Sequence, residues 1–278
     1  MAGQLIRTTI VDESFMNQQW NWHGQDYPYL TCKLLSSWRH GFFTAQFYPQ
    51  TPSELTHILQ PQTEAYRVKQ IHGNLVLTPQ EINQIVNQDN YPNSLAQADA
   101  VISDRSKQSV WVASADCTPV LIGDLATGQV AAIHAGWRGT ALKIVPQAIA
   151  RFLKFGSKLQ NLRIALGPAI SGQMYQVDQS VALKVGQSVI EHANNPSEAA
   201  ILAQLKQLSP KPILDDELPA KIRLDVAAIN QIQLEQLGIN SEQIAIAPYC
   251  TYQHKNLDTI ELFWLLCGDK RKNNVVQW

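Results

Sequence analysis

The chain has 278 residues, of which 45% are hydrophobic and 16% are charged, and its net charge is −1. This composition argues against a disordered chain, which would have fewer apolar residues and a higher net charge. The balanced charge argues against a general nucleic-acid binder, which carries a basic domain. No window holds 18 or more uncharged apolar residues, so we expect no membrane span.

Short apolar runs in the middle of the chain predict strands that are buried on both faces. These runs cover residues 99–103, 110–113, 120–122, 130–134 and 162–166, and residues 65–71 alternate like a further strand. Helical spacing of apolar residues predicts helices over 141–152 and 224–237, the second ended by Gly238. Two Gln/Asn/Pro-rich stretches, 79–94 and 194–219, predict insertions or peripheral helices. Strands that alternate with helices predict one mixed α/β domain over residues 1–278.

The cysteines are few and widely spaced and form no CxxC pair. They are Cys32, Cys117, Cys250 and Cys267. This usage favours reduced thiols and a cytoplasmic location over a disulfide framework. Asp12 and Glu13 stand where a signal peptide would have its apolar core, so we expect no cleaved leader.

Several common catalytic motifs are missing from the sequence. It has no GxGxxG, GxxxxGK[ST], GxSxG or HExxH, which disfavours Rossmann, P-loop, α/β-hydrolase and zincin enzymes. The HxE…PCxxC pattern of the zinc base deaminases is also missing.

Three segments, KQIHG, SADCTP and AIHAGWRG, contain candidate metal ligands. His72, Cys117 and His134 each follow or end a predicted strand, and ligands bind at the carboxyl edge of α/β sheets. Two imidazoles and a thiolate suit zinc and leave a fourth position for water or substrate. Taken one at a time, each residue also has an ordinary structural explanation, because histidines after strands and buried lone cysteines are common.

Three further residues are candidates for binding or proton transfer. A strand would direct Asp116 away from Cys117, whereas a turn at Thr118-Pro119 would bring it back to orient a ligand or carry a proton. Arg138 lies near a predicted helix start, where backbone N–H groups and a guanidinium bind phosphate. Tyr175 offers a hydroxyl. The alternatives are a capping or turn aspartate and an ordinary surface arginine.

A second Cys/His pair, Cys250 and His254, has a spacing that is compatible with metal binding. No other potential ligand joins it, so we interpret Cys250 as structural. The other histidines have no supporting context and are interpreted as ordinary polar residues; they are His23, His40, His57 and His192.

Together, KQIHG, ADCTPV, HAGWRGT and GPAISGQMYQVD resemble the YfiH-type family, over about residues 67–251. This family is named multicopper polyphenol oxidoreductase or laccase-like, and its members are understood as purine nucleoside phosphorylases. ADCTPV followed by HAGWRG is highly specific for it.

The resemblance implies a single-domain α/β fold with a mixed central sheet flanked by helices, and zinc held by His72, Cys117 and His134. It implies phosphorolysis of adenosine, inosine, guanosine or methylthioadenosine to the free base and ribose 1-phosphate, with adenosine deamination as a companion activity. Purine nucleosides and phosphate are therefore the expected partners. We expect Asp116, Cys117 and Arg138 to act in catalysis, and Arg138 and Tyr175, which fall on motif positions, to bind substrate.

The chain departs from the family pattern in two places. Residues 41–63 replace the usual Ser-x-x-x-Gly-Asp segment and the Asn…Asn-Arg run. Residues 262–269 replace a Phe-Ser-Tyr-Arg-Arg segment, whose arginine pair would be a natural anion site. Lys270, Arg271 and Lys272 lie just downstream. They either substitute for the missing arginine pair or form a solvated basic tail.

Three other functions compete with this prediction. Cys117 and His134 could form the nucleophile and base of a cysteine hydrolase. A multicopper oxidase needs many histidines, and the chain has seven without an HxH pair, so zinc is favoured over copper. Because the arginine pair is missing, a non-catalytic metal-binding protein remains a further alternative. The sequence carries no signal for the oligomeric state.

Overall fold

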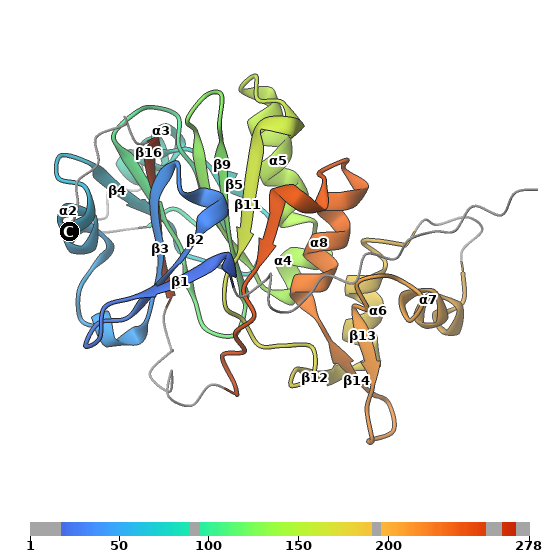
Figure 1. Cartoon of the computed structure of the whole chain (residues 1–278). Coiled ribbons are helices and arrows are strands. Elements are labelled where there is room, and N and C mark those ends of the chain that lie inside the picture. Colours follow the sequence, from blue (N-terminus) through green and yellow to red (C-terminus); the bar gives the residue numbers. More distant parts are fainter. Residues whose placement is uncertain (1–17, 89–94, 191–195, 254–262, 271–278) are drawn as a thin grey trace, which may run out of the picture.

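A computed structural model of the chain describes residues 18–88, 95–190, 196–253 and 263–270 (Figure 1). The strands are β1 Trp20–His23, β2 Tyr29–Cys32, β3 Trp38–Phe43, β4 Glu64–Arg67, β5 Val76–Leu77, β6 Ala100–Ile102, β7 Gln108–Trp111, β8 Ala113–Ser114, β9 Thr118–Asp124, β10 Val130–Ala135, β11 Leu162–Leu166, β12 Gln176–Asp178, β13 Ile213–Asp215, β14 Lys221–Leu224, β15 Ile244–Ile246 and β16 Phe263–Lys270. The α-helices are α2 Pro52–Leu59, α3 Pro79–Gln88, α4 Trp137–Ala141, α5 Ile144–Lys154, α6 Gln179–Gly186, α7 Glu198–Leu205 and α8 Val226–Gln236. Short 3-10 turns are η1 Lys33–Leu35, η2 Ala45–Phe47, η3 Leu159–Asn161 and η4 Ser241–Gln243.

The strands form two large mixed sheets and one small sheet. The first large sheet has the order β1-β2-β3-β16-β7-β4, with β8 also paired to β16. The second has the order β15-β11-β9-β10-β6-β5, and its three inner pairs are antiparallel while both outer pairs are parallel. The small sheet has the order β12-β14-β13. The expectation of a mixed α/β fold is therefore confirmed.

The two large sheets pack face to face, and helices cover the outer face of the second sheet. Trp38 and Phe42 of β3 share one buried cluster with Leu121 of β9. On the opposite face, β9 and β10 pack against α5 and α8 through a second cluster that includes Ile149 and Leu234. Every residue of β9 and β10 is buried, as the unbroken apolar runs predict. The first sheet, which covers the second, was not expected from the sequence.

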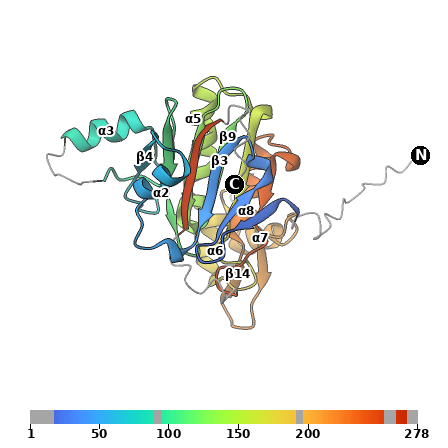
Figure 2. The same ribbon diagram turned by 60° about the vertical axis from the view of Figure 1, so that its left-hand side comes forward.

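The small sheet forms a separate cluster with α6, α7 and α8 at one end of the molecule (Figure 1). Both Gln/Asn/Pro-rich stretches contain peripheral helices, α3 in the first and α7 in the second. Figure 2 shows α3 projecting from the body on the side of β4. Neither stretch contributes a residue to the His/Cys cluster described below.

Two of the predicted elements are wrong in their extent. The strand expected over 65–71 ends at Arg67, because Lys69 forms an isolated bridge to Gln97 instead of pairing with β7. The helix expected over 141–152 is divided, because Lys143 takes a left-handed φ of 60° between α4 and α5. By contrast, β11 occupies residues 162–166 as predicted. Gly238, with a φ of 89°, directly follows the Leu237 cap that ends α8.

The indole of Trp38 from the first large sheet packs directly against Gly123 of the second. A Cβ atom at Gly123 would lie 2.7–2.8 Å from three atoms of the buried indole. We therefore expect Gly123→Ala to lower the free energy of unfolding by about 1–3 kcal/mol, because the packed indole has no room to move. Urea denaturation measures this, and an unchanged midpoint would contradict the packing described.

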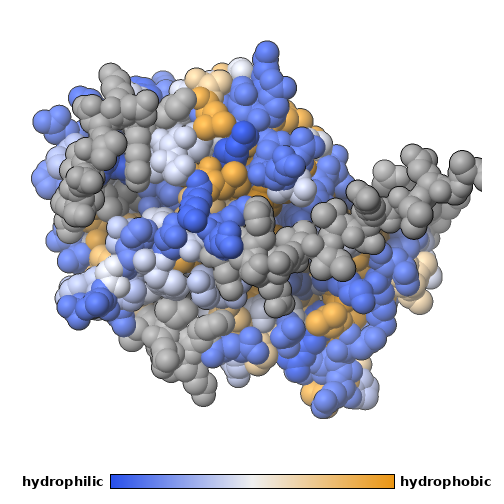
Figure 3. Space-filling model, in the orientation of Figure 1, coloured by the Kyte–Doolittle hydropathy of each residue, from blue (hydrophilic) through white to orange (hydrophobic). Residues whose placement is uncertain are grey.

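No helix among the described residues is both long and apolar enough to cross a bilayer. On the face shown in Figure 3, apolar side chains form small separate patches among hydrophilic ones. Scattered apolar residues of this kind are normal on a protein surface.

Candidate functional site

Three potential metal ligands from separate parts of the chain meet in one cluster. The ligand atoms of His72, Cys117 and His134 all lie within 4.8 Å of one another. The two imidazole rings meet edge to face, with 4.8 Å between their centroids and an angle of 83° between their planes. His72 is exposed, Cys117 is half-buried and His134 is buried, so the cluster opens to the surface on the side of His72.

The antiparallel register of β9 and β10 explains why Cys117 and His134 are neighbours. Ala135 pairs with Thr118, and His134 pairs with Pro119. Because the strands run in opposite directions, the start of β9 and the end of β10 lie at the same edge. Cys117 follows the short strand β8, in line with the expectation that each ligand follows a strand, and it also directly precedes the amino end of β9.

The loop that carries His72 is folded around the carboxylate of Asp99. Three successive backbone N–H groups donate to this carboxylate: Ile71 at 3.3 Å, His72 at 2.9 Å and Gly73 at 2.7 Å. His72 itself has a left-handed φ of 59°, a strained conformation for a non-glycine residue. Asp99 has no exposed surface, so its charge is compensated entirely by these donors and by His134.

The same carboxylate orients His134. Nδ1 of His134 donates to Oδ1 of Asp99 at 3.0 Å, and the backbone N–H of His134 donates to the carbonyl oxygen of Asp99 at 2.8 Å. Because a carboxylate accepts hydrogen bonds, the ring proton lies on Nδ1, and Nε2 is left for a ligand. Metal-binding histidines are oriented by carboxylates in this way.

Electrostatics at the cluster favour a cation. Burial alone lowers the pKa of His134, but hydrogen bonds to Asp99 and Cys117, together with their charges, raise it to about 9. Desolvation and the nearby charge of His134 lower the pKa of His72, although Asp99 opposes this. Without a metal, the site therefore holds a proton on His134, beside the Asp99 carboxylate and the Cys117 sulfur. A metal cation would take the place of that proton.

Gly136 leaves the space in front of the three ligands open. A Cβ atom there would lie 2.9 Å from Sγ of Cys117, 3.1 Å from Cδ2 of His72 and 3.7 Å from Cε1 of His134. Any side chain at this position would therefore press on two of the three candidate ligands.

Asp116 lies in a tight turn beside the cluster. The N–H of Cys117 donates to the carbonyl of Ala115 at 2.7 Å, and Asp116 between them has a φ of 65°. This is a γ-turn in its rarer and more strained form. The expectation of a turn at Thr118-Pro119 is wrong, because both residues belong to β9. The turn at Asp116 takes its place, and the Asp116 side chain is exposed.

Arg138 lies on α4, which begins directly after Gly136. Its guanidinium carbon lies 4.4 Å from the centroid of the Trp137 ring, and none of the ion pairs within the described residues involves it. The sequence placed Arg138 at the start of a helix. That helix has only five residues, so the guanidinium, rather than a helix terminus, is what α4 offers to an anion.

Buried polar contacts fix α4 against its neighbours. From α8, the amide of Asn230 donates to Oγ1 of Thr140 at 3.0 Å, and the amide of Gln233 donates to its carbonyl oxygen at 2.9 Å. At Gly139, a Cβ atom would lie 2.8 Å from the carbonyl oxygen of Gly73, so α4 touches the His72 loop. The helix that carries Arg138 is therefore held in place from both sides.

Tyr175 lies within electrostatic reach of the other candidates. Burial of its phenol raises its pKa, the charges of Cys117 and Asp116 raise it further, and Arg138 lowers it. The half-buried phenol of Tyr175 therefore interacts electrostatically with all three residues for which catalytic roles were predicted.

Cys250 is not part of the His72, Cys117 and His134 cluster. Its Sγ accepts a hydrogen bond from the backbone N–H of Ser171 at 3.3 Å, which agrees with a structural role. His254 lies outside the described residues, as do His192, Arg271 and Lys272. Residues 41–63 form the end of β3, η2 and α2.

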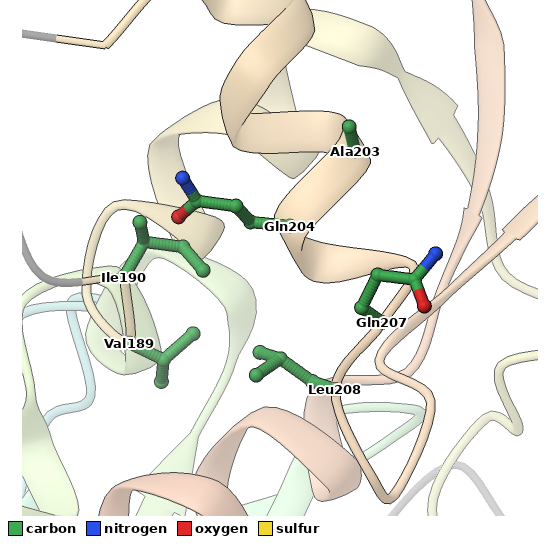
Figure 4. A pocket seen from close by; sticks show the side chains of 6 residues that line it. All are labelled: Val189, Ile190, Ala203, Gln204, Gln207 and Leu208. Carbon is green, nitrogen blue, oxygen red and sulfur yellow. The ribbon is translucent and has the colours of Figure 1, made fainter.

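A cavity of about 560 Å³ lies between the end of α6 and α7 (Figure 4). Its lining consists of four apolar side chains and two glutamines: Val189, Ile190, Ala203, Leu208, Gln204 and Gln207. It contains none of the candidate residues and no group that titrates near neutral pH, so the His/Cys cluster remains the candidate site.

The family model for multi-copper polyphenol oxidoreductase laccase matches residues 52–257. The chain belongs to this family. A purine nucleoside phosphorylase of Synechocystis is 53% identical over 86% of this chain and 90% of its own length. A purine nucleoside phosphorylase of Bacteroides thetaiotaomicron is 29% identical over 67% of each chain. The predicted family is thus confirmed.

Two solved structures share the fold of this chain. YlmD of Geobacillus stearothermophilus has a TM-score of 0.71 at 18% identity and covers 90% of this chain and 99% of its own. The YfiH protein of Bacillus licheniformis has a TM-score of 0.69 at 21% identity, with the same coverage. At these identities the similarity establishes the fold alone.

Sequence reasoning missed two residues of the site, Asp99 and Thr251. Asp99 stands directly before the apolar run Ala100–Ile102, and a carboxylate beside a fully buried strand is a signal, because it must find several donors. Thr251 donates from Oγ1 to Oδ1 of Asp116 at 2.6 Å. It carries no comparable signal, since threonine is common in any loop.

Proposed function

We propose that this chain is a zinc-dependent purine nucleoside phosphorylase. It would cleave adenosine, inosine, guanosine or methylthioadenosine with phosphate to the free base and the corresponding ribose 1-phosphate. The observation that carries the proposal is the meeting of His72, Cys117 and His134 within 4.8 Å, beside Asp116 and Arg138. The 53% identical relative named as a purine nucleoside phosphorylase supports the choice of reaction.

The residues present fit a zinc ion. Two imidazoles and a thiolate are ligands that zinc prefers, and a three-ligand set is typical of catalytic rather than structural sites. Asp99 orients His134, and Gly136 keeps the front of the cluster open. His72, Cys117 and His134 would hold the ion. The chemistry that zinc supplies at such a site is Lewis-acid polarisation of a substrate oxygen.

In this proposal Arg138 binds the phosphate. Its guanidinium is exposed at the edge of the cluster and is braced by the Trp137 ring. A guanidinium can donate two parallel hydrogen bonds to phosphate oxygens. Fixing phosphate beside the anomeric carbon would supply much of the rate enhancement by placement alone.

The reaction needs one proton to move. A phosphate oxygen forms a bond to the anomeric carbon while the bond from that carbon to the purine nitrogen breaks, and its electron pair leaves with the purine. The proton lost by dihydrogen phosphate is taken up by the purine. Asp116 would carry this proton, and the phenol of Tyr175, which faces the same charges, would bind the substrate.

Adenosine deamination would use the same residues. Water adds to the carbon that carries the amino group, the carbon–nitrogen bond breaks, and ammonia leaves with a proton from that water, giving inosine. Asp116 is the exposed carboxylate beside the cluster that could move this proton, since the Asp99 carboxylate is buried. Deamination needs water in place of phosphate, so the two activities should differ in their dependence on phosphate.

One assay tests the proposed function. The purified protein, with one zinc ion per chain, is incubated with inosine and with adenosine, each with and without phosphate, and the products are separated by chromatography. We expect hypoxanthine and an equal amount of ribose 1-phosphate from inosine only when phosphate is present. Inosine formed from adenosine without phosphate would support the deaminase activity. The absence of phosphate-dependent base release would contradict the proposal.

A cysteine hydrolase is the alternative that one observation favours, since the ring nitrogen of His134 lies within 4.8 Å of Sγ of Cys117. If the isolated protein contains no metal, a nucleophilic thiol of this kind would react with iodoacetamide. Stoichiometric alkylation of Cys117, together with turnover that does not depend on phosphate, would favour the hydrolase over the phosphorylase.

Gly136→Ala is expected to weaken zinc binding while the fold is retained. The new Cβ atom would press on Cys117 and His72, and ligand geometry tolerates only small displacements. We expect a loss of zinc affinity of about 10- to 100-fold, comparable with the loss of an orienting partner. Competition with a chromophoric chelator measures it, and wild-type affinity would show that Gly136 does not limit the site.

A further inference from the structure

The turn that carries Asp116 is fixed by the segment that follows β11. The carbonyl oxygen of Asp116 accepts a hydrogen bond from the N–H of Ile170 at 2.9 Å. Its φ of 65° is a conformation that a non-glycine residue keeps only when its surroundings hold it there. This hydrogen bond fixes the backbone of Asp116. A second hydrogen bond fixes its side chain.

That second contact comes from Thr251, which is 135 positions later in the chain. Oγ1 of Thr251 donates to Oδ1 of Asp116 at 2.6 Å. A hydroxyl that donates to a carboxylate makes a charge-assisted hydrogen bond, which is stronger than a neutral one. No hydrogen bond to Oδ2 of Asp116 occurs among the described residues, so this bond holds the carboxylate by one oxygen and leaves the other for proton transfer.

Thr251 is itself tethered to the segment that holds Asp116. Its N–H donates to the carbonyl oxygen of Ala169 at 3.0 Å, and Cys250 forms a parallel bridge with Ala169. Ser171 donates from its backbone N–H to Sγ of Cys250 at 3.3 Å. The Ala169–Ser171 segment thus contacts both partners of the hydrogen bond, so it fixes their relative position.

We propose that Thr251 is a positioning residue, which holds the Asp116 carboxylate in the orientation needed for proton transfer. This inference rests on the proposed function, since it assigns the proton transfer to Asp116. Without the hydroxyl, the exposed carboxylate would rotate among several orientations, and small misplacements of a reacting group lower the rate by up to about 100-fold. Substrate and phosphate would still bind, because neither depends on the orientation of Asp116.

The test compares Thr251→Val, which removes the hydroxyl at nearly constant shape, with Thr251→Ser, which keeps it. We expect Thr251→Val to lower kcat for phosphorolysis of inosine by about 10- to 100-fold with KM changed little. Thr251→Ser should restore most of kcat. Zinc content and the midpoint of thermal unfolding are measured on each variant, and the zinc content should remain at one ion per chain.

A double-mutant cycle with Asp116→Asn separates positioning from general structural damage. Thr251→Val should cost little further activity in the Asp116→Asn background, because the carboxylate that Thr251 orients is gone. Thr44→Val is the matched control, since Oγ1 of Thr44 donates to the carbonyl oxygen of Pro28 beyond the end of β3, and this variant should keep wild-type kcat.

Each outcome bears on the inference. Wild-type kcat in Thr251→Val, equal losses in Thr251→Val and Thr251→Ser, or additive losses in the cycle would overturn it while the wild type still phosphorolyses inosine. If the wild type itself releases no base with phosphate, the proposed function fails and the assignment to Thr251 fails with it. Restoration by serine together with non-additivity would establish the positioning role.

Discussion

Cys117→Ala is expected to abolish both zinc binding and phosphorolysis. Cys117 supplies the only sulfur of the three-residue cluster, and its removal leaves two imidazoles that cannot complete a three-ligand site. The loss of zinc affinity should exceed the roughly 100-fold effect of losing an outer partner. Elemental analysis and phosphate-dependent release of hypoxanthine from inosine, made on the same sample, measure the two effects together.

Cys32→Ala is the matched control for this variant. Cys32 is buried among the apolar residues between the two large sheets and lies outside the His/Cys cluster. We expect it to lose some stability and to keep both zinc and activity. If Cys117→Ala retained full phosphate-dependent base release, the role given to the metal would be wrong. If Cys32→Ala lost zinc as well, the metal would not be located by Cys117.

Asp99→Asn is expected to lower both zinc affinity and stability, although Asp99 itself is not among the three clustered ligands. Its two oxygens accept four N–H groups: Oδ1 accepts from His72 and His134, and Oδ2 accepts from Ile71 and Gly73. The amide nitrogen of asparagine cannot accept a hydrogen bond, so in either orientation two donors would face an NH₂ group. We expect about 10- to 100-fold weaker zinc binding and a loss of about 1–3 kcal/mol in the free energy of unfolding.

Asp124→Asn is a matched control because Asp124 is another fully buried aspartate. It lies at the far end of β9 from Cys117, and its Oδ1 accepts from the N–H groups of Ala126 and Thr127. An asparagine carbonyl can keep both bonds, so we expect a small loss of stability and wild-type zinc affinity. Chelator competition and urea denaturation distinguish the two variants. Equal zinc affinities in both would contradict the role given to Asp99.

The fold was predicted best where the chain is buried on both sides. The apolar runs of β9, β10 and β11 need no partner to be recognised, because a strand covered on both faces is apolar throughout. The split between α4 and α5 could not be predicted, since lysine rarely takes the left-handed conformation that Lys143 has. The sheet that covers β9 and β10 depends on pairing between strands far apart in the chain, and local sequence patterns do not predict such pairing.

The candidate ligands were predictable from their motifs, but the reason for their meeting was not. The antiparallel register that brings Cys117 beside His134 is a property of the folded sheet. The roles of Asp99 and Thr251 were not predicted, because each forms its hydrogen bonds with residues at least 26 positions away in the chain. The supporting contacts of a site are set by tertiary structure, whereas the residues that bear its chemistry are of recognisable types.

The family name refers to copper, whereas the proposed function assigns zinc. The described cluster offers one cysteine and two histidines, which form a single three-ligand site. A multicopper enzyme needs further histidines for its other copper ions, and the whole chain has seven. The proposal therefore keeps the fold of the family and assigns the chemistry from the ligands.

The most direct test of the metal assignment is an anomalous difference map at the zinc absorption edge, from crystals of protein purified with its metal. We predict one peak, about 2.0–2.1 Å from a ring nitrogen of His72 and of His134 and about 2.3 Å from Sγ of Cys117. A map with no peak at this position, or with a peak that any of these three side chains fails to reach, would contradict the account.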